Sequence, residues 1–172
     1  ITGGTFIRAL SGTGLAAISA YQLSDIYGVQ GIGSDGMQDK YYKLANNIDA
    51  AGTANWNGGA GFKPVGDSFT AFTGTFDGLG RSISDLTINR PGEGYVGLFG
   101  NSSGTINGVS LVGANVSGYQ YVGALAGNNS GTISNSSAAG VLDGGEGYSG
   151  GLVGYNGGSV TDSSAAVTVS GY

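Results

Sequence analysis

Apolar positions recur with a fixed spacing in the second half of the chain. Three leucines are evenly spaced with a 27-residue period, and each is followed by an apolar residue and then glycine: Leu98, Leu125 and Leu152. A second apolar column keeps the same spacing: Ile106, Ile133 and Val160. Short polar segments rich in Asn, Ser and Gly separate the two columns. Each unit therefore reads as short strands separated by corners, and we expect these six apolar side chains to form the core.

A period of this length is typical of a solenoid, in which one repeat cannot bury its apolar face alone and must stack on its neighbours. Three short strands in each unit leave no room for a crossover helix. A propeller blade needs about 40–50 residues, and a leucine-rich repeat would contain several leucines per unit. The pattern predicts an all-β fold, a right-handed parallel β-helix with about 27 residues per coil in the C-terminal half.

The chain divides into three parts by the regularity of this pattern. Residues 91–170 form three repeats, residues 41–90 form divergent coils, and residues 1–40 form an irregular or capping segment. A short helix is expected over residues 24–33, with Ser24 as its N-cap. We interpret residues 1–172 as one β-helix domain, and as a fragment of a much longer chain because no initiator Met or signal segment begins it.

Composition narrows the chemistry. The chain has 37 glycines among 172 residues, which disfavours a helical bundle. It contains no His and no Cys, so the usual zinc ligands, the thiol nucleophile and the imidazole base are all missing. No basic side chain follows Arg90, which argues against nucleic-acid binding. Because those ligands are missing, we expect no metal and no cofactor. No apolar run reaches the roughly 20 residues that cross a bilayer, so we also expect no membrane insertion.

Several segments resemble a known motif. Residues 98–100, 125–136 and 151–160 are similar to successive GLUG motifs, and the segments before them resemble the block that introduces such motifs in filamentous-haemagglutinin-like proteins: residues 42–49, 56–66 and 72–78. The resemblance implies a bacterial secreted exoprotein, commonly an adhesin exported by two-partner secretion, at the cell surface or outside the cell. GLUG motifs also accompany the peptidase domains of immunoglobulin A-cleaving metalloproteases, where they are not catalytic.

Tyrosines form a second periodic set. Tyr95, Tyr121 and Tyr148 begin successive units at almost the same period as the leucines, so their rings are expected to stack on one face. Such a ladder can stabilise the solenoid. It can also face a ligand, because Tyr combines an apolar ring with a hydroxyl that can bind sugars. Both interpretations remain open from the sequence.

An enzymatic interpretation rests on carboxylates, because β-helix folds host polysaccharide lyases and hydrolases. The candidate acidic residues are Asp49, Asp67, Asp77 and Asp85, with Arg81 as a nearby cation. Two carboxylates at roughly 5–9 Å could serve a glycosidase. The same residues suit turns and strand ends, so no catalytic residue is assigned. A serine nucleophile within residues 147–151 would have no His as its base.

We therefore expect a non-enzymatic structural and adhesive segment of a surface exoprotein, a rigid shaft that supports attachment. Its expected partners are a host-cell or biofilm glycan or protein receptor, the adjoining repeats of the same chain, and further copies through end-to-end self-association. The alternatives are a carbohydrate-active β-helix enzyme, and a glycan-binding module or accessory region of a secreted metallopeptidase.

Overall fold

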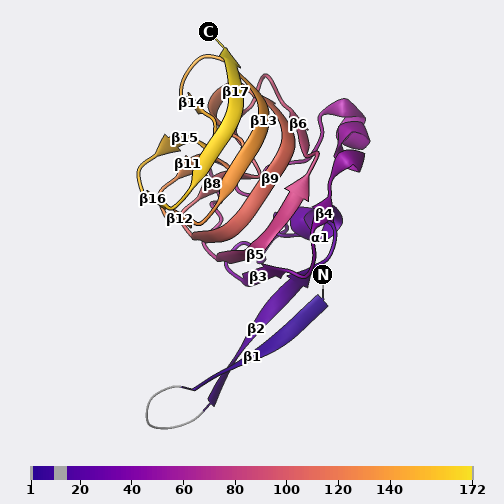
Figure 1. The fold of residues 1–172 in the computed structure, drawn as a ribbon, viewed down its shortest axis with the longest axis vertical. Coiled ribbons are helices and arrows are strands. Elements are labelled where there is room, and N and C mark those ends of the chain that lie inside the picture. Colours follow the sequence, from indigo (N-terminus) through magenta and orange to yellow (C-terminus); the bar gives the residue numbers. More distant parts are fainter. Residues whose placement is uncertain (1, 10–14, 172) are drawn as a thin grey trace.

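The computed structural model describes residues 2–9 and 15–171, with side chains from residue 20 onward. The chain winds into a parallel β-solenoid of about four turns, which confirms the predicted fold class (Figure 1). The sheets contain 11, three and three strands. Parallel pairing of each strand with its counterpart one turn later holds the coils together.

The three sheets form the walls of the C-terminal coils. The first small sheet consists of β7 (Gly94–Val96), β10 (Gln120–Gly123) and β14 (Ser149–Gly150). The second consists of β8 (Phe99–Ser102), β11 (Ala126–Asn129) and β15 (Val153–Asn156). The third wall consists of β9 (Thr105–Gly118), β12 (Thr132–Ser134), β13 (Ser137–Gly144), β16 (Ser159–Thr161) and β17 (Ser164–Gly171).

The strand register follows the sequence period. Ile133 pairs with Ile106 on one side and with Val160 on the other, which is the 27-residue step. The step is one residue shorter where Val122 of β10 pairs with Val96 of β7, which explains the shorter first interval of the tyrosine set. A similar shortening occurs within the pairing of β9 with β13, where the register shifts. The coils thus absorb single-residue differences without losing their parallel pairing.

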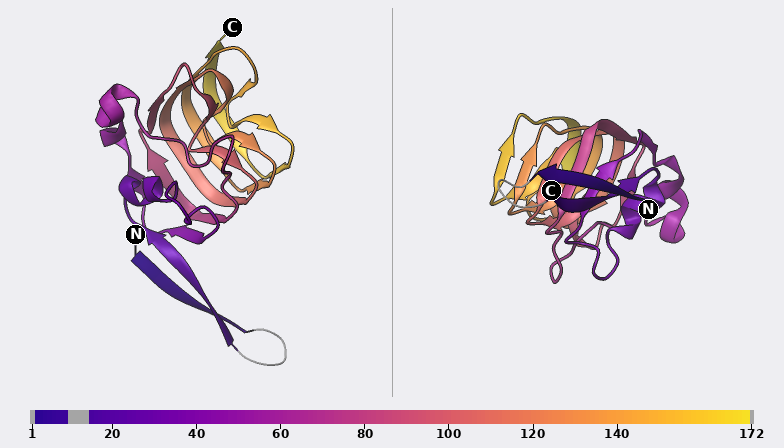
Figure 2. Two further views of the ribbon diagram at one scale, coloured as in Figure 1. Left: turned by 180° about the vertical axis from the view of Figure 1, so that it is seen from behind. Right: turned by 90° about the horizontal axis from the view of Figure 1, so that it is seen from below.

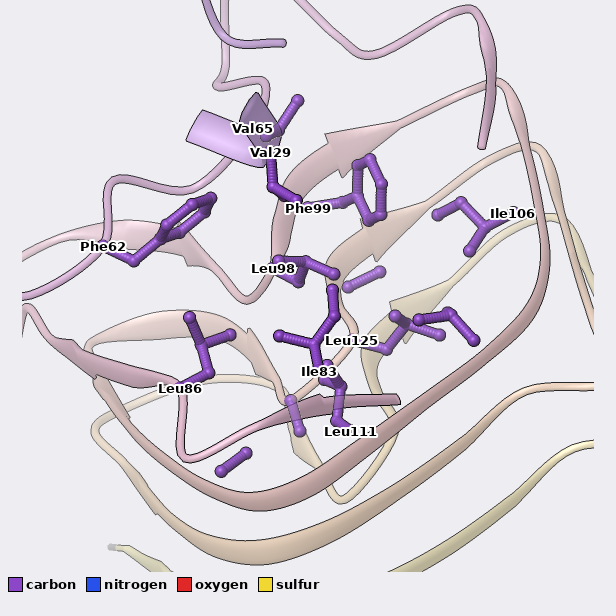
Figure 3. Packing of buried hydrophobic residues seen from close by; sticks show 14 of the residues in the cluster. Val29, Phe62, Val65, Ile83, Leu86, Leu98, Phe99, Ile106, Leu111 and Leu125 are labelled. Carbon is purple, nitrogen blue, oxygen red and sulfur yellow. The ribbon is translucent and has the colours of Figure 1, made fainter. Parts of the chain in front are cut away.

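The core runs through the middle of the coils. Leu98, Ile106, Leu125 and Ile133 are fully buried, and Figure 3 shows the first three among the packed interior side chains. Leu152 is only partly buried and packs against this cluster.

The prediction that Val160 belongs to the core is wrong, because its side chain is 36% exposed. The residue does share a register with the buried Ile133. However, β16 is the outermost strand of its wall in the described part of the chain. With no later strand stacked on this one, the residue's position in the apolar column does not bury it.

The N-terminal segment is more regular than expected. β1 (Thr2–Ala9) and β2 (Leu15–Leu23) pair antiparallel and project from the solenoid as a hairpin (Figures 1 and 2). β2 also pairs parallel to β3 (Tyr41–Leu44), so it begins the stack of strands. Residues 1–40 are therefore not simply irregular, although residues 1 and 10–14 of that range lie outside the described part.

The short helix is present as α1 (Ile26–Gly31). Its N-cap is Asp25 and not Ser24: an Asp25 carboxylate oxygen accepts a hydrogen bond from the Gly28 amide at 2.8 Å. Both residue types can cap a helix, and the cap is set by where the apolar face begins. That face buries Ile26 and Val29 against the N-terminal coils.

The less regular coils complete the stack. They contain β4 (Ile48–Asp49), the 3-10 segment η1 (Ala51–Gly59), β5 (Thr75–Ser84) and β6 (Thr87–Asn89). The backbone of η1 is kinked and non-helical at residues 56–58, so η1 is two short turns and not one helix. β5 pairs with β3 before it and β9 after it, and β6 also pairs with β9. α1 and η1 lie together on one flank of the solenoid near its N-terminal end (Figure 2).

Candidate functional site

A column of glycines allows the coils to come close together near Tyr95, Tyr121 and Tyr148, the three tyrosines that begin successive units. The glycine of each Leu-x-Gly triplet faces backbone: a Cβ on Gly127 would lie 2.4 Å from the Tyr121 carbonyl oxygen and 2.6 Å from the Val96 nitrogen. A Cβ on Gly100 would similarly lie 2.4 Å from the Tyr95 carbonyl oxygen. The glycines are therefore required for close approach of the chain segments that carry the ladder.

The first two ladder tyrosines have an uncommon backbone conformation. Tyr95 has φ of 59° and Tyr121 has φ of 51°, the left-handed region that bulky residues rarely occupy. At Tyr148 the positive φ belongs instead to the preceding Gly147, at 124°. Such strain persists only where the surrounding structure enforces it. Here the residues before and after each tyrosine are paired between β7 and β10, Gly94 with Gln120 and Val96 with Val122, and this pairing holds the two tyrosines in place.

The three rings stack, as the spacing predicts. The ring centroids of Tyr95 and Tyr121 are 4.9 Å apart with 26° between the planes, and those of Tyr121 and Tyr148 are 5.5 Å apart with 19°. Tyr155 stands edge-on to Tyr148 at 5.2 Å. Tyr148 and Tyr155 are 55% and 43% exposed, whereas Tyr95 and Tyr121 are half-buried. We call Tyr95, Tyr121 and Tyr148 the tyrosine ladder.

The stacking limits what the ladder can bind. Tyr121 has a neighbouring ring on each face, so a sugar cannot stack on it without displacing one of them. At Tyr121 the ladder therefore presents the ring edge and the hydroxyl group to solvent. Edges and hydroxyls suit hydrogen bonding more than stacking on the apolar face of a sugar.

A second candidate surface is a cleft of about 710 Å³ beside α1 and η1. Tyr27 of α1 and Trp56 of η1 line it, with ring centroids 4.7 Å apart and 37° between their planes. Residues of the loop over residues 63–70 and Arg90 also line it. The repeat pattern of the sequence does not predict this cleft. The one sequence feature that marks it is the single Trp of the chain, Trp56.

Hydrogen bonds fix the walls of this cleft. The Gln30 side chain donates to the Lys63 carbonyl and accepts from the Lys63 amide, both at 2.9 Å. These two bonds join α1 to the loop. Asp67 accepts from the amides of Phe69 and Thr70, both at 2.8 Å, which closes the loop into a turn.

The other predicted carboxylates serve local turns. Asp49 accepts from the Ala51 amide at 2.9 Å, and Asp77 accepts from the Leu79 amide at 3.0 Å and from the Asn107 side chain at 3.2 Å. Asp85 has φ of 58°, at a corner. Of the four candidates, the lining of the cleft includes only Asp67. Among the described residues no group of three or more His, Cys, Asp or Glu could hold a metal ion.

Two ion pairs are found in the described part of the chain. Lys40 pairs with Asp39 at 2.7 Å, and this contact lowers the pKa of the carboxyl and raises that of the amine. Arg90 pairs with Glu93 at 2.8 Å, and its guanidinium also donates to the Phe62 carbonyl at 3.1 Å. The second pair lies at the edge of the cleft.

No described helix is long and apolar enough to span a membrane.

Comparisons with known proteins support part of the family resemblance. The family model of the GLUG motif matches residues 145–170. The chain is 41% identical over 131 residues to halomucin of Haloquadratum walsbyi. The aligned region covers 67% of this chain and 1% of halomucin. It is 36% identical over 75 residues to an Evansella cellulosilytica protein described as a putative Gly-rich membrane protein, covering 42% of this chain and 9% of that protein.

The chain spans only a small part of the length of these relatives. No solved structure matches the chain significantly. The GLUG resemblance is confirmed for the last repeat, whereas the relation to filamentous-haemagglutinin-like proteins and to two-partner secretion stays a prediction. The chain is a β-solenoid that contains a GLUG motif.

Proposed function

We propose that this chain is a rigid, non-catalytic segment of a cell-surface or secreted protein that supports attachment. The observation that carries the proposal is the continuous register of the coils, in which each strand of residues 91–171 pairs with its counterpart one turn away. A solenoid of this kind is held by contacts between neighbouring coils and extends in one direction. The similarity to halomucin and to a Gly-rich membrane protein supports a surface or secreted location.

The absence of catalysis is part of the proposal. Asp49 and Asp77 accept hydrogen bonds from nearby backbone amides, which is the arrangement of a turn. A catalytic pair would instead need two carboxyl groups facing one substrate bond. The tyrosine ladder supports the rigidity of the shaft, and its edges and hydroxyl groups offer a contact surface for a glycan or a protein.

Attachment can be measured with beads that carry the purified chain. We expect coated beads to adhere to glycan-bearing cells or biofilm more than uncoated beads do. The variant Leu125→Ala, in which the core of the solenoid is damaged, is the control. If attachment needs an intact shaft, beads coated with this variant should adhere less than beads coated with the unmodified chain. Equal adhesion of coated and uncoated beads would contradict an adhesive role.

A polysaccharide screen tests the enzymatic alternative. Reducing ends or unsaturated products should not accumulate when the chain is incubated with neutral and acidic polysaccharides. Turnover that disappears in Asp77→Asn or Asp85→Asn would replace the structural proposal with a carbohydrate-active enzyme.

A further inference from the structure

The cleft beside α1 and η1 differs from the tyrosine ladder in how much aromatic ring surface is open to a ligand. Tyr27 packs against Trp56 on one side and is 70% exposed. Its exposed surface lies in a hollow, whereas the central ring of the ladder is covered on both faces. We propose that this cleft binds a short neutral saccharide, which names a ligand class for attachment and so rests on the proposed function.

The chemistry of the lining matches the two sides of a sugar ring. A sugar has an apolar face of C–H groups, which packs well on an aromatic ring, and a rim of hydroxyls that both donate and accept hydrogen bonds. Tyr27 and Trp56 supply the apolar surface. Ser34, Asp35 and Lys63 line the same cleft and supply acceptors and donors.

The cleft is held in shape before any ligand arrives. The paired hydrogen bonds between Gln30 and Lys63 join two segments 33 residues apart, so the helix and the loop keep a fixed spacing. The Asp67 turn fixes the far end of the loop. A preformed site loses less conformational entropy on binding than a flexible one, which matters for weakly binding ligands such as sugars.

Charge disfavours an anionic ligand. The carboxylates of Asp35 and Asp67 are matched in the lining by the cations of Lys63 and Arg90. Glu93, which pairs with Arg90 at 2.8 Å, adds one more carboxylate at the edge of the cleft, so the acidic groups here outnumber the basic ones by one. A polyanionic sugar would need an excess of cations, which this cleft does not have. A quaternary ammonium ion is the competing ligand, and choline is therefore included in the test below. The volume of about 710 Å³ lies in the usual range of small-molecule sites, about 300–1,000 Å³.

The single Trp makes the site easy to observe, because Trp56 lines the cleft and is the only Trp in the chain. Its fluorescence can be titrated with cellotetraose, xylotetraose, mannotetraose and chitotetraose, with choline and tetragalacturonate as charged comparisons. We expect saturable changes in emission with at least one neutral saccharide. A response to none of them, or to choline or tetragalacturonate alone, would overturn the proposal.

Variants separate the cleft from the ladder. Tyr27→Ala and the exposed substitution Asp35→Ala should each weaken binding by about 10-fold or more. Asp35→Ala provides a second test if Tyr27→Ala disturbs α1, which circular dichroism would show. Val112→Ala is the control, because Val112 is 48% exposed, lies in β9 and is not part of the lining. Equal loss of binding in Tyr121→Ala and no loss in Asp35→Ala would assign the sugar to the ladder and overturn the cleft.

The bead assay distinguishes this proposal from the proposed function. If the coated beads adhere but no saccharide binds, the proposed saccharide site in the cleft is wrong and the adhesive role stands. Beads that fail to adhere while Trp56 still responds to a neutral saccharide would contradict the adhesive role and leave the cleft in place.

Discussion

The side-chain nitrogen of Asn129 donates a hydrogen bond to the side-chain oxygen of Asn156, 2.7 Å away and 27 residues later in the sequence. Asn129 is fully buried although it is polar. The same relation joins Asn128 to Asn101 at 2.8 Å and Ser137 to Ser110 at 2.9 Å. Polar side chains at equivalent positions thus connect successive coils, as amide ladders do in other stacked β structures.

The Asn129–Asn156 contact predicts different costs for its two partners. Asn129→Ala removes a buried amide that also accepts from the Gly131 backbone at 3.2 Å, and should lower the free energy of unfolding by about 1–3 kcal/mol. Asn156→Ala should cost less because Asn156 is exposed. Urea denaturation of both variants measures the difference. Equal costs would contradict the role of burial.

A second prediction compares two members of the apolar columns. Leu125→Ala should cost roughly 2–5 kcal/mol because the side chain is fully buried. Val160→Ala should cost well below that, since Val160 is 36% exposed. Chemical denaturation gives both values. A loss below about 0.5 kcal/mol for Leu125→Ala is typical of a surface site and would show that the core is misplaced.

The sequence period is sufficient to predict the coils because it is a direct consequence of stacking. Ile106 and Ile133 must repeat if one strand lies on the next, so their spacing predicts both the register and their burial. Burial of Val160 depends instead on whether another coil covers it, and no feature of the repeat itself decides that. For this reason the column was predicted correctly and the exposure of its last member was not.

The cleft could not be predicted in the same way. It forms where α1, η1 and the loop over residues 63–70 meet, and none of these segments belongs to the regular repeat. The hydrogen bonds between Gln30 and Lys63 depend on tertiary contacts over 33 residues. Periodicity aligns positions that share a column, whereas this site unites positions with no common period.

A third prediction concerns the glycine of the Leu-x-Gly triplet. Gly127→Ala would place a Cβ within 2.4 Å of backbone oxygen, so the coils must separate, at a cost of about 1–3 kcal/mol. Gly92→Ala is the matched control because nothing lies within 4 Å of its added Cβ. We expect Gly92→Ala to change stability little. Near-ultraviolet circular dichroism should also show weakened tyrosine stacking in Gly127→Ala only.

The outermost coil predicts self-association. β14, β15, β16 and β17 each pair on one side only among the described residues, and Val160 and Val169 are exposed there. Unpaired strand edges are templates for pairing with another chain. Sedimentation velocity should therefore show association that increases with protein concentration, and Val160→Lys should reduce it. A monomer at every concentration would contradict the prediction.

The final prediction concerns stability at high pH. Burial raises the pKa of the Tyr42 hydroxyl, with smaller contributions from Tyr21 and Asp39, and the hydroxyl donates to the Met37 carbonyl. The folded chain thus holds this proton more tightly than the unfolded chain, in which Tyr titrates near pH 10. Its contribution to stability is complete below about pH 10 and is lost as pH rises toward the folded pKa.

Tyr42→Phe tests this expectation because it removes the titrating group and keeps the ring. The variant should lose about 0.5–1.5 kcal/mol at neutral pH with the hydrogen bond to Met37, since a typical hydrogen bond contributes that amount. Between about pH 9 and about pH 11 its free energy of unfolding should then fall less steeply than that of the unmodified chain, because no hydroxyl remains to ionise at this position. Denaturation at a series of pH values measures both slopes, and identical slopes would show that Tyr42 is not the group that couples folding to alkaline pH.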